Sequence, residues 1–112
     1  MIDAAAFGGI IALYDKHGWK LRLVLLSAPL KERLAGAVPT GVEVKDSDLD
    51  AAWFSRSSRP ESTAWEIRHL SENPFALVEV IENDTDEKEA EAVLSAAEAK
   101  MLDITAKRPR AN

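Results

Sequence analysis

Five polar residues have side chains that suit the binding of a small charged ligand. Two arginines stand in the serine-rich segment 55–62, and a guanidinium group holds a carboxylate or phosphate through parallel hydrogen bonds. A histidine further along the chain can act as a general base when an acid or an orienting partner lies within reach. The candidate ligand-binding residues are Arg56, Arg59, Arg68, His69 and Glu79.

The spacing of these residues argues against a shared catalytic site. Arg68 and His69 are neighbours, and neighbouring residues in a strand point to opposite faces of a sheet. No glycine-rich phosphate loop accompanies Arg56 and Arg59, and the chain contains no GxSxG, HExxH or GxGxxG motif. We therefore predict no catalytic residue, and ligand binding is an alternative to a protein-interaction function.

The sequence gives little support to metal or redox chemistry. The chain has no cysteine, which excludes disulfides, thiolate catalysis and cysteine-ligated clusters. Asp46, Asp48 and Asp50 alternate like the start of a calcium loop, but Ala51 stands where that loop needs glycine, and Ser57 stands where it needs glutamate. We interpret the three aspartates as a solvated turn and expect neither a metal nor another cofactor.

Length and charge restrict the class of protein further. A chain of 112 residues is one domain, and 46% apolar with 29% charged residues is typical of a globular protein. The net charge of −5 disfavours a nucleic-acid partner, because phosphate binding needs a positive surface. The apolar run at residues 4–14 is too short to span a bilayer, so we expect no membrane partner and a cytoplasmic location.

Helical periodicity marks both ends of the chain. A helix over residues 4–17 is predicted by an apolar stripe, with Asp3 as its N-cap and Gly18 at its left-handed end. A short helix is predicted over residues 29–35. A C-terminal amphipathic helix over residues 86–104 begins with acidic residues, which suit the positive end of a helix dipole. Its apolar stripe consists of Ala90, Val93, Leu94, Ala97, Met101 and Ile104.

Alternating and continuous apolar runs predict the strands. The run at residues 19–26 first alternates and then becomes continuously apolar, as in a central strand covered on both faces. Residues 56–62 are predicted to form an exposed connection. The further predicted strands are a short one at 42–44, one at 51–55, and a hairpin over 63–82 with its turn at 71–74.

Together these elements predict a single α+β domain over residues 1–104. The predicted order is α-β-α-(β)-β-β-β-α, with a mainly antiparallel sheet on which the C-terminal helix packs. Residues 105–112 are predicted to form a short basic tail that frays.

One face of the predicted hairpin has no obvious cover. We expect the turn to centre between Glu72 and Asn73. Ile67 then shares a face with Val78 and Val80, which the C-terminal helix can cover. The opposite face is left exposed, and an exposed apolar patch marks a partner, as does a tryptophan at a surface. The expected interaction residues are Leu70, Phe75, Leu77, Ile81 and Trp53.

We therefore predict a non-enzymatic protein-interaction module, a small acidic homodimer whose partner is another protein or a second copy of itself. The alternative is a small-ligand-binding or catalytic domain. Its pocket would lie between sheet and helices and would use His69 and the nearby arginine and glutamate residues.

Overall fold

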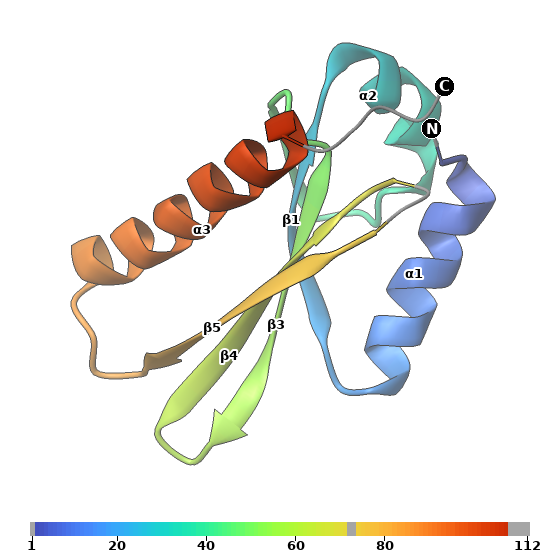
Figure 1. Ribbon diagram of the computed structural model, residues 1–112. Helices are drawn as coiled ribbons and strands as arrows, with labels where there is room; N and C mark the ends of the chain where they lie inside the picture. The colour runs from blue at the N-terminus through green and yellow to red at the C-terminus, as the bar shows by residue number, and fades with distance from the viewer. Residues whose placement is uncertain (1, 72–73, 108–112) are drawn as a thin grey trace.

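A five-stranded sheet lies between helices in the computed structural model, which describes residues 2–71 and 74–107 (Figure 1). The sheet order is β2-β1-β3-β4-β5; β2 runs parallel to β1, and all other neighbours are antiparallel. The predicted α+β fold, with its mainly antiparallel sheet, is thereby confirmed. The elements are α1 (Ala4–Lys16), β1 (Lys20–Leu26), α2 (Ala28–Leu34), a 3-10 turn η1 (Ala35–Ala37), β2 (Glu43–Asp46), β3 (Ala51–Arg59), β4 (Ser62–His69), β5 (Ala76–Glu82) and α3 (Glu87–Lys107).

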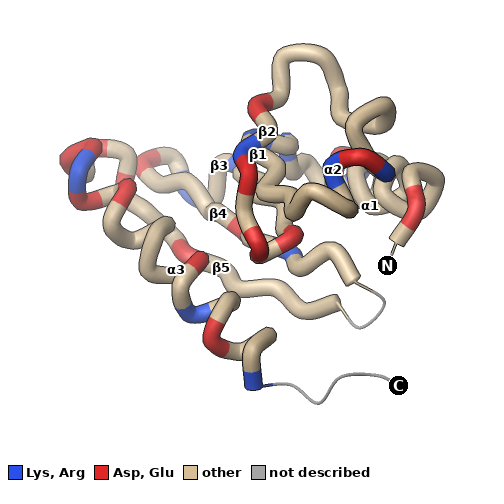
Figure 2. Tube along the Cα trace, turned by 90° about the horizontal axis from the view of Figure 1, so that it is seen from above, with Lys and Arg blue, Asp and Glu red and all other residues tan. Residues whose placement is uncertain are grey.

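The helices lie on opposite faces of the sheet, so the protein has three layers (Figure 2). Strand β3 shows why, because Trp53 and Phe54 are both large and, as neighbours, point to opposite faces. Phe54 packs with residues of α1 and α2 and is fully buried. Trp53 packs with Ala97 and Met101 of α3 and is 2% exposed. Each face therefore has its own hydrophobic core.

Helix α1 forms as its sequence predicts. The carboxylate of Asp3 accepts a hydrogen bond from the Ala6 amide at 2.8 Å, and Gly18 follows the helix with a φ of +84°. The side chains of the apolar stripe all belong to the core on this side of the sheet; they are Phe7, Ile10, Ile11 and Tyr14.

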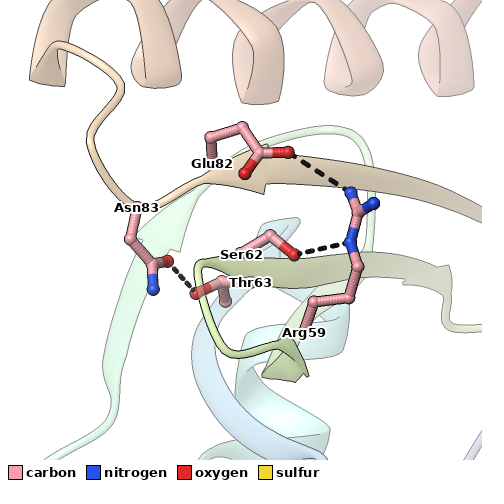
Figure 3. A network of polar contacts seen from close by, with 5 residues as sticks. All are labelled: Arg59, Ser62, Thr63, Glu82 and Asn83. Atoms are coloured by element: carbon pink, nitrogen blue, oxygen red, sulfur yellow. Dashed lines mark hydrogen bonds and ion pairs between the residues drawn. The ribbon is translucent and has the colours of Figure 1, made fainter.

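The segment 56–62 is not the exposed connection that we predicted. Strand β3 continues to Arg59, so that only residues 60–61 form the turn before β4. Ladder pairing continues from Ser57 with Thr63 to Arg59 with Ser62, across a bulge. Side chains reinforce this end of the sheet: Arg59 donates to Ser62 Oγ at 3.4 Å and forms an ion pair with Glu82 at 3.3 Å (Figure 3).

The predicted pairing between β4 and β5 is wrong by one residue. Ile67 lies opposite Leu77, whereas a turn centred between residues 72 and 73 would place it opposite Val78; the turn residues themselves lie outside the described part of the chain. The shift inverts every side chain of β5. It brings Phe75 and Leu77 under α3 in place of alanine and valine, and the larger side chains remove more apolar area from water.

Helix α3 covers Trp65 and Ile67 as predicted, but it does not cover the predicted Val78 and Val80, and it continues further than predicted. Ala97 and Met101 are buried in the core, and Leu94 packs against it. The helix continues to Lys107, where the ammonium group pairs with the Asp103 carboxylate one turn earlier at 3.0 Å. Residues 108–112 of the predicted tail lie outside the described residues.

Asp50 joins the start of β3 to the turn between β1 and α2. Its carboxylate accepts hydrogen bonds from the Ser27 amide at 2.7 Å and from the Ser27 hydroxyl at 3.1 Å. Its carbonyl accepts from the Leu70 amide at 2.8 Å. The residue adopts a φ of +53°, a left-handed conformation that aspartate tolerates better than most side chains. Asp50 is therefore a structural residue of this turn.

Replacing Asp50 tests this role. We expect Asp50→Ala to lower the free energy of unfolding by about 2–3 kcal/mol, because the Ser27 amide loses its acceptor and alanine strains the left-handed backbone. Asp50→Gly loses the same hydrogen bonds without the strain, so it should be the milder change by roughly 1 kcal/mol. Urea unfolding of both variants measures the two contributions, and equal stabilities for the wild type and Asp50→Ala would contradict the assignment.

Candidate functional site

The outer edge of β5 presents backbone groups that no strand of the described chain pairs. The His69 amide donates to the Phe75 carbonyl at 2.9 Å, and the Asn83 amide donates to the Glu61 carbonyl at 2.8 Å. Because bonding alternates along an antiparallel pair, the odd-numbered residues of β5 bond to β4. The even-numbered residues therefore direct their amides and carbonyls outward, away from the sheet.

The side chains of these even-numbered residues lie on the face that α1 and α2 cover elsewhere. Both helices lie over β1, whereas α3 lies over β4 and β5 on the other face. Val78 and Val80 consequently remain 53% and 48% exposed. An apolar surface thus adjoins an unpaired strand edge, a combination that favours pairing with another chain.

The residues predicted to form the interaction face do not lie together on one exposed surface. Leu70 is buried in the core beneath α1 and α2. Trp53 is buried on the opposite face, where its indole donates to Glu98 Oε2 at 2.8 Å. Phe75 and Leu77 pack in that same core, and Ile81 is half-buried on their face of β5. The uncovered surface is on β5 as expected, but it belongs to the other set of side chains.

The sequence carries a signal that would have identified this set. From the residue before β5 to its end, the larger side chains, Phe75, Leu77 and Ile81, alternate with the smaller Ala76, Val78 and Val80. Helix α3 covers only one face of β5, so burial of the larger side chains on that face is favoured. Side-chain size therefore indicates which face is covered, whereas the assumed turn centre does not.

The five predicted ligand residues are spread over the sheet. Arg68 lies opposite Ala76 on the face of α1, whereas Glu79 lies opposite Trp65 on the face of α3, so the two charges cannot form a cross-strand pair. The remaining three contact different partners. His69 contacts Ser71 Oγ through Nδ1 at 2.9 Å, Arg59 pairs with Glu82, and Arg56 donates to the His17 carbonyl at 3.1 Å.

Arg56 lines a cleft together with two cations that sequence reasoning missed, Lys20 and Arg22. These residues alternate with leucines at the start of β1, and antiparallel pairing with β3 brings them beside Ser55. The sequence shows this alternation of charged residues and leucines, but it does not show that β3 is the strand that pairs with β1.

Tyr14 connects α1 to β4 through a polar contact at the border of the core. Its hydroxyl donates to Glu66, its ring stacks on Phe54 at 4.0 Å between centroids, and the Arg68 guanidinium lies 5.7 Å above it. Burial and the neighbouring Glu66 carboxylate disfavour a second negative charge, and they raise the pKa of Tyr14 to about 12.

Comparison with known proteins identifies no relative: the chain matches no protein-family model, no curated protein and no solved structure. In the described ranges, no helix is long and apolar enough to cross a membrane. The same residues contain no group of three or more histidine, aspartate or glutamate side chains placed to hold a metal ion.

The environment of Tyr14 predicts an alkaline loss of stability. The folded-state pKa of about 12 lies above the ordinary value of 10.0, so the neutral phenol is favoured by folding. Stability from this group is complete below pH 10 and falls as the pH rises towards 12. Tyr14 is the only tyrosine, so near-ultraviolet phenolate absorbance reports it alone.

Tyr14→Phe is the control for other groups that titrate at high pH, and its urea midpoint should fall less steeply between pH 10 and 12. A phenolate transition centred at pH 10 in the folded wild type would contradict the assigned environment.

Proposed function

We propose that this protein is a non-enzymatic interaction module that forms a homodimer through the outer edge of β5. The observation that carries the proposal is the coincidence, on one strand, of outward-directed backbone groups with the exposed Val78 and Val80. Backbone hydrogen bonds of an added strand supply affinity, and the alternating side chains supply specificity. A second copy of the chain offers a strand with the same properties.

Antiparallel pairing of two β5 strands satisfies the two-fold symmetry of a homodimer. In a pairing centred on Val78, the two Val78 side chains face each other and Val80 faces Ala76 of the second copy. Glu79 then lies opposite Leu77. A pairing centred on Glu79 would place two carboxylates opposite each other, which is destabilising in a sheet. We therefore favour the arrangement centred on Val78.

The resulting sheet would have twice the number of strands and no free β5 edge. The pairing uses one strand of seven residues, so the interface is small and the dimer should dissociate on dilution. A second protein is a further proposed partner, which would bind the surface formed by the two copies. We propose a cytoplasmic location for the acidic dimer, and neither nucleic acid nor membrane as its partner. The alternative based on His69 is less supported, because its residues do not converge.

A lysine at position 78 should prevent dimerisation, because it places two positive charges at the centre of the proposed interface. We expect Val78→Lys to raise the dimer dissociation constant at least tenfold, measured by sedimentation equilibrium. The matched control is Leu13→Lys on α1, since Leu13 is 51% exposed and Val78 is 53% exposed. A wild type that stays monomeric at millimolar concentration, or equal effects of the two lysines, would refute the proposal.

Crosslinking tests the arrangement itself. The chain has no cysteine, so Val78→Cys introduces a single thiol, and facing residues in a hydrogen-bonded antiparallel pair lie within the span of a disulfide. Mild oxidation should convert Val78→Cys into a covalent dimer much faster than Leu13→Cys. Equal rates would show that the copies do not meet at Val78.

A further inference from the structure

A cleft of about 610 Å³ opens at the end of the sheet where β1 begins and the β3–β4 hairpin projects past it. Figure 1 shows this projection and the nearby turn between α1 and β1. The lining residues come from that turn and from β1, β3 and β4; they are His17, Gly18, Lys20, Arg22, Ser55, Arg56, Ser57, Ser58 and Thr63.

Positive charge is concentrated in this cleft, although the chain as a whole carries a net charge of −5. Lys20, Arg22 and Arg56 line it, and no aspartate or glutamate does. Within residues 2–71 and 74–107, none of the three forms an ion pair. Arg22 also borders a second hollow beneath α3 that contains Glu91 and Glu98, so its far side faces acidic residues.

Two of the three cations are held in place by contacts that leave donors available. Arg22 donates through Nε to Ser55 Oγ at 2.7 Å, and Ser55 is 2% exposed. Among the described residues, no hydrogen bond uses the terminal nitrogens of Arg22 or the proton of the Ser55 hydroxyl. Arg56 lies 4.7 Å above the Trp19 ring and uses one terminal nitrogen on the His17 carbonyl. Pre-positioned donors lose less entropy when they bind a ligand.

Hydroxyl groups provide further hydrogen-bond donors in the cleft. Ser57 and Ser58 line the cleft, and Ser57 pairs with Thr63 across the ladder. Thr63 donates its own proton to Asn83 Oδ1 at 2.8 Å, so its hydroxyl does not donate to a ligand (Figure 3). Ser55, Ser57 and Ser58 are therefore the hydroxyl donors of the cleft.

We propose that this cleft binds a phosphorylated small molecule through its phosphate group. The cleft lies at the edge of β3 that β1 leaves unpaired beyond Lys20, where Arg22 reaches it from the α3 face and Arg56 from the α1 face. Two guanidinium groups and one ammonium around this edge match a multiply charged tetrahedral anion better than a single carboxylate, and serine hydroxyls add donors to the remaining oxygens. The volume lies within the range of about 300–1,000 Å³ of small-molecule sites, so it holds more than the phosphate. The proposal is independent of the dimer, because no residue of β5 lines the cleft.

Titration with inorganic phosphate, followed by the amide resonances of the ¹⁵N-labelled full chain, tests the anion site. We expect saturable shifts at residues 17–22 and 55–58 with millimolar affinity. Arg22→Gln and Arg56→Gln should each weaken binding about tenfold, and Arg22→Lys should give an intermediate loss, because lysine keeps the charge but not the fork. Arg33→Gln on α2 removes the same charge outside the cleft and should retain wild-type affinity.

The second arm compares inorganic phosphate with sugar phosphates and their unphosphorylated parent sugars. Tighter binding of at least one sugar phosphate than of inorganic phosphate, with no binding of its parent, supports the proposal. Inorganic phosphate binding at least as tightly as every sugar phosphate would overturn the assignment to a small molecule. No saturable shifts, or an equal loss in Arg33→Gln, would overturn the anion site altogether; thermal unfolding of each variant confirms that it is folded.

Discussion

Burial of β3 on both faces is the constraint on which the rest of the structure depends. Trp53 and Phe54 are adjacent, and each needs its own hydrophobic layer because adjacent strand residues point in opposite directions. One layer of helices cannot cover both. The chain meets this requirement by placing α1 and α2 on one face and α3 on the other, so the first and last helices are separated by the sheet.

Three helices are too few to cover five strands on both faces, and the shortage falls on β5. Helix α3 covers β4 and β5 on one face, while α1 and α2 lie over β1 on the other. The open area therefore coincides with the outer edge of the sheet. Val78 and Val80 lie on it beside unpaired backbone groups, so the same geometry that completes two cores leaves a surface suited to a second chain.

The cleft has a different electrostatic character from the chain as a whole. Acidic residues gather at the start of α3 (Figure 2), whereas Lys20, Arg22 and Arg56 surround the cleft beside the α1–β1 turn. A protein with a net charge of −5 thus presents a positive cleft, and Glu91 and Glu98 of α3 lie on the far side of Arg22, outside the cleft. The proposed dimer edge and the proposed anion site thus use different elements, and each can be disrupted without changing a residue of the other.

Local signals in the sequence determined the helices and the approximate strands. The Asp3 cap, the Gly18 end and the apolar stripes of α1 and α3 act within one or two helical turns, so they could be read without knowledge of the fold. The same holds for the alternation of Trp65, Ile67 and His69, which share a face as predicted. These features depend on neighbours in the chain.

Tertiary structure alone decided which faces meet and which remain open. The pairing of β4 with β5 differs by one residue from the predicted pairing, because the larger side chains are buried beneath α3. Side chains alternate between faces along a strand, so a shift of one residue moves every side chain of β5 to the other face. The grouping of Lys20 and Arg22 with Arg56 likewise required the antiparallel pairing of β1 and β3, elements separated by α2 and β2 in the chain. Side-chain types were fixed by sequence, but their neighbours were selected by burial and strand pairing across the whole domain.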